Sequence, residues 1–214
     1  MHHSLQRGLA IAIVALGLFQ ANRSSANLIV NGSFEVSNIG AGTFAILPSI
    51  TGWTSTMGGG IEIQNHVAGL SYLGARHVEL DSTSNSNMRQ FAATALGSVY
   101  HLSFAYSARP GRKAADNSIE GYFNGGLLTT LMANGIGLEN TNWRVFNFNV
   151  TGAAGSSVLE FRAVGPSNSY GGYLDGVSLA AVAEPPGLLL FAMGLRTMVR
   201  RLWRLTRSLK RLLS

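Results

Sequence analysis

Short runs of alternating apolar and polar residues, separated by glycine, asparagine and serine, constrain the fold of this chain most. Four such runs are HLSFAYS, VFNFNV, VLEFRAV and RHVELDS. Successive side chains of a strand point to opposite faces, so this alternation predicts antiparallel strands that are covered on one side. It predicts the following inward-facing residues: Val78, Leu80, Leu102, Phe104, Tyr106, Phe146, Phe148, Val150, Leu159 and Phe161.

Composition supports β structure between the two ends of the chain. The 214 residues include 26 glycines, and only 12% are charged, which suits a turn-rich β protein better than a helical bundle. Residues 27–182 are enough for one compact core, show no amphipathic helix, and predict a β-sandwich. The absence of cysteine excludes disulfides, thiolate metal sites and cysteine nucleophiles.

Basic charge is concentrated at the ends of the chain. Residues 27–184 hold seven basic and all ten acidic side chains, a net charge of −3, whereas residues 196–214 hold seven basic side chains. A phosphate-binding surface needs clustered positive charge. We therefore expect no nucleic-acid partner for the central domain.

The first 26 residues have the pattern of a secretory signal peptide. A short basic region precedes the apolar run Leu9–Phe19, and Ser24 and Ala26 occupy the small positions before a cleavage site. The apolar run is shorter than the roughly 20 residues needed to span a bilayer. We expect a signal helix that is removed on export; the alternative is a first buried helix.

The C-terminal stretch AEPPGLLLFAMGLRTMVRR combines a Glu-Pro motif, a short apolar segment and an arginine cluster. Residues 183–214 resemble the PEP-CTERM sorting signal, and Glu184 and Pro185 match its core. The resemblance implies processing by a membrane-embedded exosortase in an exopolysaccharide-producing Gram-negative bacterium. It also implies transient anchoring in the inner membrane and delivery to the cell surface or extracellular matrix.

This copy departs from the sorting-signal pattern in two respects. Arg196 interrupts the apolar segment, and the tail continues as RRLWRLTRSLKRLLS. In that tail, leucines recur at helical spacing between basic residues, which is typical of an amphipathic helix on an anionic membrane surface. We therefore expect a hydrophobic and basic C-terminal helix; an ordinary solvated helix is the alternative.

The ends of the central domain are similar to those of the galactose-binding-like jelly rolls, a group that includes many carbohydrate-binding modules. The similar segments are NLIVNGSFE, residues 27–35, and GGYLDGVSL, residues 171–179. The resemblance implies an all-β, antiparallel jelly-roll sandwich whose first and last strands pair. It also implies a structural Ca²⁺ held by Glu35, Asp175 and backbone carbonyls. Alternatively, both acids only accept backbone hydrogen bonds in turns.

Residue patterns for catalysis are sparse. The chain contains no G-x-S-x-G, H-E-x-x-H or P-loop motif. His66, His77 and His101 lack metal-ligand spacing, and we expect each to be solvated. Glu79 and Asp81 share one face of a strand, about 7 Å apart, which suits the acid pair of an inverting glycosidase. A solvated polar strand face explains the same pair without catalysis.

Sugar binding requires an aromatic ring beside hydrogen-bonding side chains. The predicted ligand-binding residues on outward faces are Glu120, Tyr122, Asn124, Asn147 and Asn149. The loops SARPGRK and SNSYGGY are the alternative location, because they carry three cations and two tyrosines. We expect Trp53 and Trp143 to lie in the core.

These features predict an exported, non-catalytic protein of the cell surface or extracellular matrix that binds an exopolysaccharide or another polysaccharide. The alternative is a structural or adhesive matrix protein with no defined sugar ligand. A glycoside hydrolase is the third interpretation.

Overall fold

The computed structural model describes residues 25–182. The predicted signal helix, the C-terminal helix, and the sorting motif at Glu184 and Pro185 lie outside the described residues.

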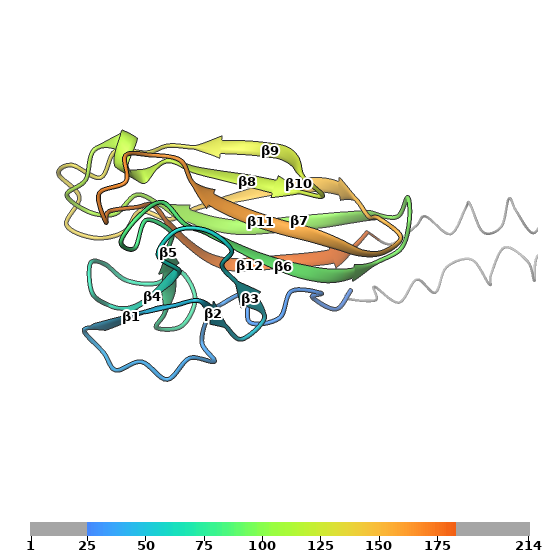
Figure 1. Ribbon diagram of the computed structural model, residues 1–214, viewed down its shortest axis with the longest axis horizontal. Coiled ribbons are helices and arrows are strands. Elements are labelled where there is room, and N and C mark those ends of the chain that lie inside the picture. Colours follow the sequence, from blue (N-terminus) through green and yellow to red (C-terminus); the bar gives the residue numbers. More distant parts are fainter. Residues whose placement is uncertain (1–24, 183–214) are drawn as a thin grey trace, which may run out of the picture. The chain divides into compact units, whose positions relative to one another are not determined.

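Twelve strands form two six-stranded sheets among the described residues, and every pair of neighbouring strands is antiparallel (Figure 1). Sheet A has the order β1-β4-β5-β12-β7-β10, and sheet B has the order β2-β3-β6-β11-β8-β9. The strands are β1 Thr43–Leu47, β2 Ser49–Ile50, β3 Trp53–Thr54, β4 Ile61–Asn65, β5 His77–Glu79, β6 Asn87–Thr94, β7 Val99–Ser107, β8 Ile119–Phe123, β9 Gly126–Leu131, β10 Arg144–Thr151, β11 Gly155–Ala163 and β12 Tyr173–Ala181.

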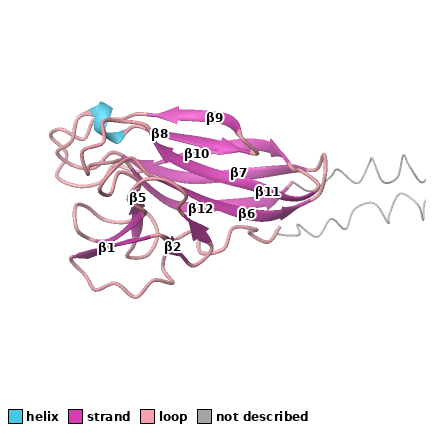
Figure 2. Ribbon diagram, in the orientation of Figure 1, coloured by secondary structure: helices cyan, strands magenta, loops and turns pink. Residues whose placement is uncertain are grey.

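The strand order from β5 onward is that of a jelly roll. Successive strands alternate between the sheets, except at the β8–β9 hairpin, so that β5-β12-β7-β10 packs on β6-β11-β8-β9. The predicted all-β, antiparallel jelly-roll sandwich is therefore confirmed. The described part of the chain has one helix, the short 3-10 turn Ala114–Asn117, near loops gathered at one end of the sandwich (Figure 2). It includes no helix long and apolar enough to cross a membrane.

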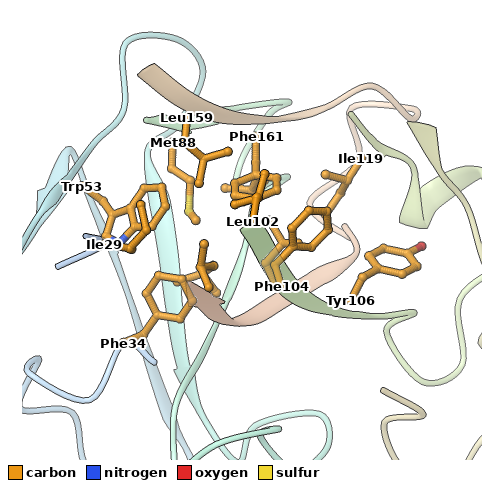
Figure 3. Close-up of a cluster of buried hydrophobic side chains, with 14 of the residues drawn as sticks. Ile29, Phe34, Trp53, Met88, Leu102, Phe104, Tyr106, Ile119, Leu159 and Phe161 are labelled. Carbon is orange, nitrogen blue, oxygen red and sulfur yellow. The ribbon is translucent and has the colours of Figure 1, made fainter. Parts of the chain in front are cut away.

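The alternating runs place their apolar side chains between the sheets, as predicted. Leu102 and Phe104 of sheet A and Leu159 and Phe161 of sheet B are fully buried. The rings of Phe104 and Phe161 meet edge to face, with centroids 4.8 Å apart. Trp53 is also in this core, beside Phe161 (Figure 3). Burial of these large side chains is the main source of stability for a domain without disulfides.

The N-terminal segment lies beside the last strand but is not itself a strand. The Leu28 amide donates to the Leu179 carbonyl, and the Val177 amide donates to the Gly32 carbonyl. The predicted proximity of residues 27–35 and β12 is thus correct, whereas the predicted strand is wrong. Asn31 and Phe34 have φ values of 53° and 61°, which turn the backbone away from an extended path.

Candidate functional site

Within residues 25–182, the outer surface of sheet B is a partly exposed polar and aromatic face, which we call the open face. Phe91, in the middle of β6, is 62% exposed, while its sequence neighbours Gln90 and Ala92 are buried. The charged and aromatic side chains of this face come from three adjacent strands: Arg89 and Phe91 of β6, Glu160 and Arg162 of β11, and Glu120 and Tyr122 of β8.

Strand register arranges the open face in two rows. Arg89, Glu160 and Tyr122 are direct neighbours across β6, β11 and β8. In the adjacent row, Arg162 pairs with Glu120, and Thr130 of β9 pairs with Glu120 on its other side. Cross-strand neighbours are close enough for their side chains to interact. The rows therefore alternate charges of opposite sign around one aromatic ring.

Hydrogen bonds hold the side chains of the open face in defined positions. The Arg162 guanidinium donates two bonds of 2.9 Å to the Glu160 carboxylate and lies over the Tyr122 ring, 4.4 Å from its centroid. The Tyr122 hydroxyl donates to Glu120, and the Asn87 amide donates to Glu160. Hydrogen bonds from Arg162 lower the pKa of Glu160 despite its partial burial. The result is an ordered network that is accessible from solvent.

The structure separates the five residues predicted to bind sugar. Glu120 and Tyr122 lie together on the open face, whereas Asn147 and Asn149 point outward from β10 in sheet A. Asn124 belongs to neither face. With Gly125 it forms the β8–β9 turn with φ values of 51° and 79°, and its side-chain oxygen accepts the Val158 amide.

Sequence reasoning missed Arg89, Phe91 and Arg162 as members of the open face. The alternation in VLEFRAV places Glu160 and Arg162 on one side of a strand, so their mutual contact could have been predicted. Their contact with Tyr122 and Arg89 depends on the order β6-β11-β8. No local sequence signal specifies that order.

The outer surface of the β4, β5 and β12 part of sheet A, which we call the covered face, is buried under loops. Its members are Glu62 and Gln64 of β4, His77 and Glu79 of β5, and Tyr173 and Asp175 of β12. The Gln64 amide bridges two carboxylates, at 2.8 Å from Glu62 and 2.7 Å from Glu79. Arg109, from the loop after β7, forms an ion pair with Glu79.

The predictions of a solvated His77 and of a solvated Glu79–Asp81 strand face are wrong. His77, Glu79 and Asp81 are each at most 1% exposed. Burial lowers the pKa of His77 to about 3 and raises the pKa of Glu79 to about 8, although Arg109 acts in the opposite direction on Glu79. Loops from distant parts of the chain cause this burial, for example through the Gly171 amide that donates to Glu79.

Glu35 and Asp175, the predicted calcium ligands, both accept backbone amides of the loop at residues 72–76. Glu35 accepts the amides of Ala75 and Arg76 and forms a 2.9 Å ion pair with the Arg76 side chain. Asp175 accepts amides from residues 72, 73 and 176, and its burial raises its pKa to about 7. All four carboxylate oxygens therefore have N–H donors, and in this arrangement the pair does not fit a calcium ion.

The two loops proposed as an alternative sugar site do meet. The guanidinium carbons of Arg109 and Arg112 lie 5.0 Å and 3.1 Å from the ring centroid of Tyr170. Trp143 lies in the loop layer above His77, with ring centroids 5.8 Å apart, and is not a core residue. The predicted core position was correct for Trp53 and wrong for Trp143.

A cleft of about 480 Å³ lies between the edge strands β9 and β10. Its lining includes Tyr106 and Phe146 between the sheets and the polar residues Asn134, Asn142 and Arg144 at its margin. None of the residues that line it within the described range 25–182 is acidic. Thr130 borders both this cleft and the open face, where its hydroxyl lies 3.5 Å from Glu120.

No family model matches the chain. Among curated proteins, it is 31% identical over 166 residues to a multifunctional-autoprocessing repeats-in-toxin of Vibrio cholerae, covering 76% of this chain. It is 29% identical over 154 residues to the corresponding Vibrio vulnificus protein, covering 71% of this chain. The chain spans only about 3% of the length of each of these relatives.

Similar solved structures include several carbohydrate-binding modules. Family 16 Carbohydrate Binding Module-2 has a TM-score of 0.46 at 16% identity, covering 72% of this chain and 99% of the module. TmCBM61, solved with beta-1,4-galactotriose, has a TM-score of 0.44 at 16% identity, covering 74% of this chain and 100% of the module. A family 35 carbohydrate-binding module from Clostridium thermocellum has a TM-score of 0.44 at 14% identity, covering 64% of this chain and 97% of the module.

Proposed function

We propose that this chain is an exported, non-catalytic protein of the cell surface or extracellular matrix, and that its sandwich binds a polysaccharide on the open face. The observation that carries the proposal is the ordered network of Arg162, Glu160 and Glu120 around the Tyr122 ring. Sugar recognition combines an aromatic surface with carboxylate and guanidinium partners for hydroxyl groups. The open face supplies both on adjacent strands.

Preorganisation supports binding on this face. Long side chains lose rotamer freedom when they grip a ligand, and that loss reduces affinity. Here the Arg162–Glu160 pair and the Tyr122–Glu120 bond restrict those side chains before any ligand arrives. Arg162 covers one side of the Tyr122 ring, and the proposed sugar stacks on the other side.

The ionisation of the carboxylates supports binding without catalysis. A glycosidase acid must hold a proton near neutral pH, which requires a raised pKa. The pKa of Glu160 is instead lowered by Arg162. The pKa of Glu79 is raised to about 8, but its side chain is fully buried under loops, where a polysaccharide has no access.

Export forms part of the proposal through residues 1–26 and 183–214, outside the described residues except for 25 and 26. The proposed route includes cleavage of the signal peptide and recognition of Glu184 and Pro185 by an exosortase-type enzyme at the inner membrane. Intact-mass measurement of the native secreted protein tests this route. Retention of residues 1–26 would contradict the signal peptide, and an uncut C-terminus would contradict processing.

A glycan array probed with the full chain tests the binding proposal. We expect retention on a subset of polysaccharides, and loss of that signal for Tyr122→Ala. If the folded wild type binds none of the glycans, a structural matrix protein without a sugar ligand becomes the better interpretation. Release of reducing ends would instead indicate a hydrolase.

A further inference from the structure

Near the loop end of the sandwich, two buried carboxylates have no cationic partner within residues 25–182, as is also true of Glu62 and Asp175. Asp81 follows β5 and is 1% exposed, and Asp116, in the 3-10 turn, is 6% exposed. The ion pairs of residues 25–182 involve Arg76, Arg109 and Arg162 with other acids. Buried aspartates are almost always paired with a cation or coordinate a metal. These two carboxylates therefore require an explanation.

Oxygen atoms without hydrogen-bond donors occur at the same place. Oδ1 of Asp81 and Oδ1 of Asn85 are both buried and accept no hydrogen bond in the described residues. Asp81 and Asn85 are partners in an antiparallel bridge, so their side chains leave the backbone on the same side. The Asn85 amide nitrogen donates to the Gly165 carbonyl at 2.7 Å, which identifies the other atom as the oxygen.

The loop at residues 165–168 links Asp116 to Asp81 and Asn85. The Asn168 backbone amide donates to Oδ2 of Asp81 at 2.9 Å, and its side-chain amide donates to Oδ1 of Asp116 at 3.0 Å. Asn85 contacts the same segment, because its backbone amide donates to the Ser167 hydroxyl at 3.0 Å. Three side-chain oxygens, two from the loop between β5 and β6 and one from the 3-10 turn, thus converge on residues 165–168.

We propose that Asp81, Asn85 and Asp116 form a calcium site, distinct from the pair Glu35 and Asp175. Calcium binds six to eight oxygen ligands in flexible geometry, including carboxylates, side-chain amide oxygens, backbone carbonyls and water. Magnesium requires near-ideal octahedral geometry, to which irregular loops are less suited.

The proposed site contains fewer acidic side chains than a metal site built from three or more acids, histidines or cysteines. No group of three or more His, Cys, Asp or Glu side chains within residues 25–182 is arranged to hold a metal. The proposed site has two acids and takes its remaining ligands from an amide oxygen, carbonyls and water. The bound ion neutralises the two carboxylates and fixes the loop that leads into β6, the first strand of the open face.

Calcium titration of the full chain after EDTA treatment tests the proposal. We expect calorimetry to show one Ca²⁺ bound per chain. At a hundredfold excess of Ca²⁺ over Kd, we expect the melting temperature to rise by about 5–10 °C, and the same concentration of Mg²⁺ to raise it less. Absence of binding heat and of a thermal shift would overturn the proposal and assign the free oxygens to water.

Variants separate this site from the other acidic pair. Asp81→Asn keeps an acceptor for the Asn168 amide but removes the charge, and we expect it to abolish calcium binding. Asp175→Asn is the matched control and should keep the calcium response. A response that survives in Asp81→Asn, or that disappears only in Asp175→Asn, would overturn the proposal. If Asp81→Asn does not fold, Asn85→Ala decides, because we expect it to bind Ca²⁺ at least tenfold more weakly and unchanged affinity would refute the site.

Discussion

The two outer faces of the sandwich carry the same kind of ion pair in opposite surroundings. On the covered face, Arg109 pairs with Glu79, whose side chain is fully buried; on the open face, Arg162 pairs with Glu160, and the Arg162 side chain is 39% exposed. Burial raises the pKa of Glu79, whereas hydrogen bonds from Arg162 lower the pKa of Glu160. Similar residues on one architecture therefore differ in chemistry according to what covers them.

The difference indicates separate roles for the two faces. The attraction within a buried ion pair offsets the desolvation penalty of its two charges only in part. Removal of one partner is strongly destabilising, because it leaves the other charge buried and unpaired. An exposed pair contributes little to stability but remains available to a ligand. The covered face thus holds the loops on sheet A, and the open face is the one on which we propose binding.

The largest expected effect is on stability, when the arginine of each pair is replaced. Arg109→Leu should reduce the free energy of unfolding by about 3–5 kcal/mol at pH 9, because the pair is ionised in the wild type and the variant must either bury an unpaired Glu79 carboxylate or protonate it. Arg162→Leu should reduce it by at most about 1 kcal/mol. Urea unfolding monitored by fluorescence measures both. Equal losses for the two variants would contradict the distinction between the faces.

An intermediate effect is expected on sugar binding. Tyr122→Ala should weaken the affinity for a bound polysaccharide by about 1–3 kcal/mol, because the variant removes the aromatic surface. The matched control is Asn147→Ala with Asn149→Ala, on the outer side of β10, and it should bind like the wild type. Native affinity gels containing the polysaccharide compare the two. Loss of binding only in the asparagine variant would move the site to sheet A.

Opposite pH dependences of stability are also expected for the two carboxylates. The folded-state pKa of Glu79 is raised from 4.5 to about 8, so its stabilising contribution is complete below about pH 4.5 and is lost as the pH rises toward 8. The pKa of Glu160 is lowered from 4.5, so its contribution is present above about pH 4.5 and is lost as the pH falls through the folded-state value.

Glutamine variants isolate these two pH dependences. Relative to the wild type, Glu79→Gln should remove a decline in stability between about pH 4.5 and 8, and Glu160→Gln should remove a decline below about pH 4.5. Unfolding free energies measured from pH 3 to 9 provide the test. His77, whose pKa is lowered by burial, is present in all three proteins. Parallel curves for wild type and Glu79→Gln would contradict the raised pKa of this carboxylate.

The sequence by itself determined which side of each strand enters the core. Side chains alternate with the pleat of a single strand, so the inward positions of Leu102, Phe104, Leu159 and Phe161 follow from local spacing. The Asn124-Gly125 turn is equally local, because these residue types adopt the left-handed conformation that a tight hairpin requires. In the sequence alone, Glu79 of RHVELDS and Glu160 of VLEFRAV occupy the same kind of outward position and cannot be told apart.

Only the tertiary structure decided that Glu79 is fully buried and that Glu160 stays partly accessible. The cover over Glu79 comes from Arg109 and Gly171, about 30 and 90 residues away in the chain, and the open face depends on the order of β6, β11 and β8. Both depend on which distant segments pack together, and a period-two pattern carries no information about that. The surroundings of a carboxylate control its pKa and its access to a ligand, so the role proposed for each carboxylate can be argued only from the folded chain.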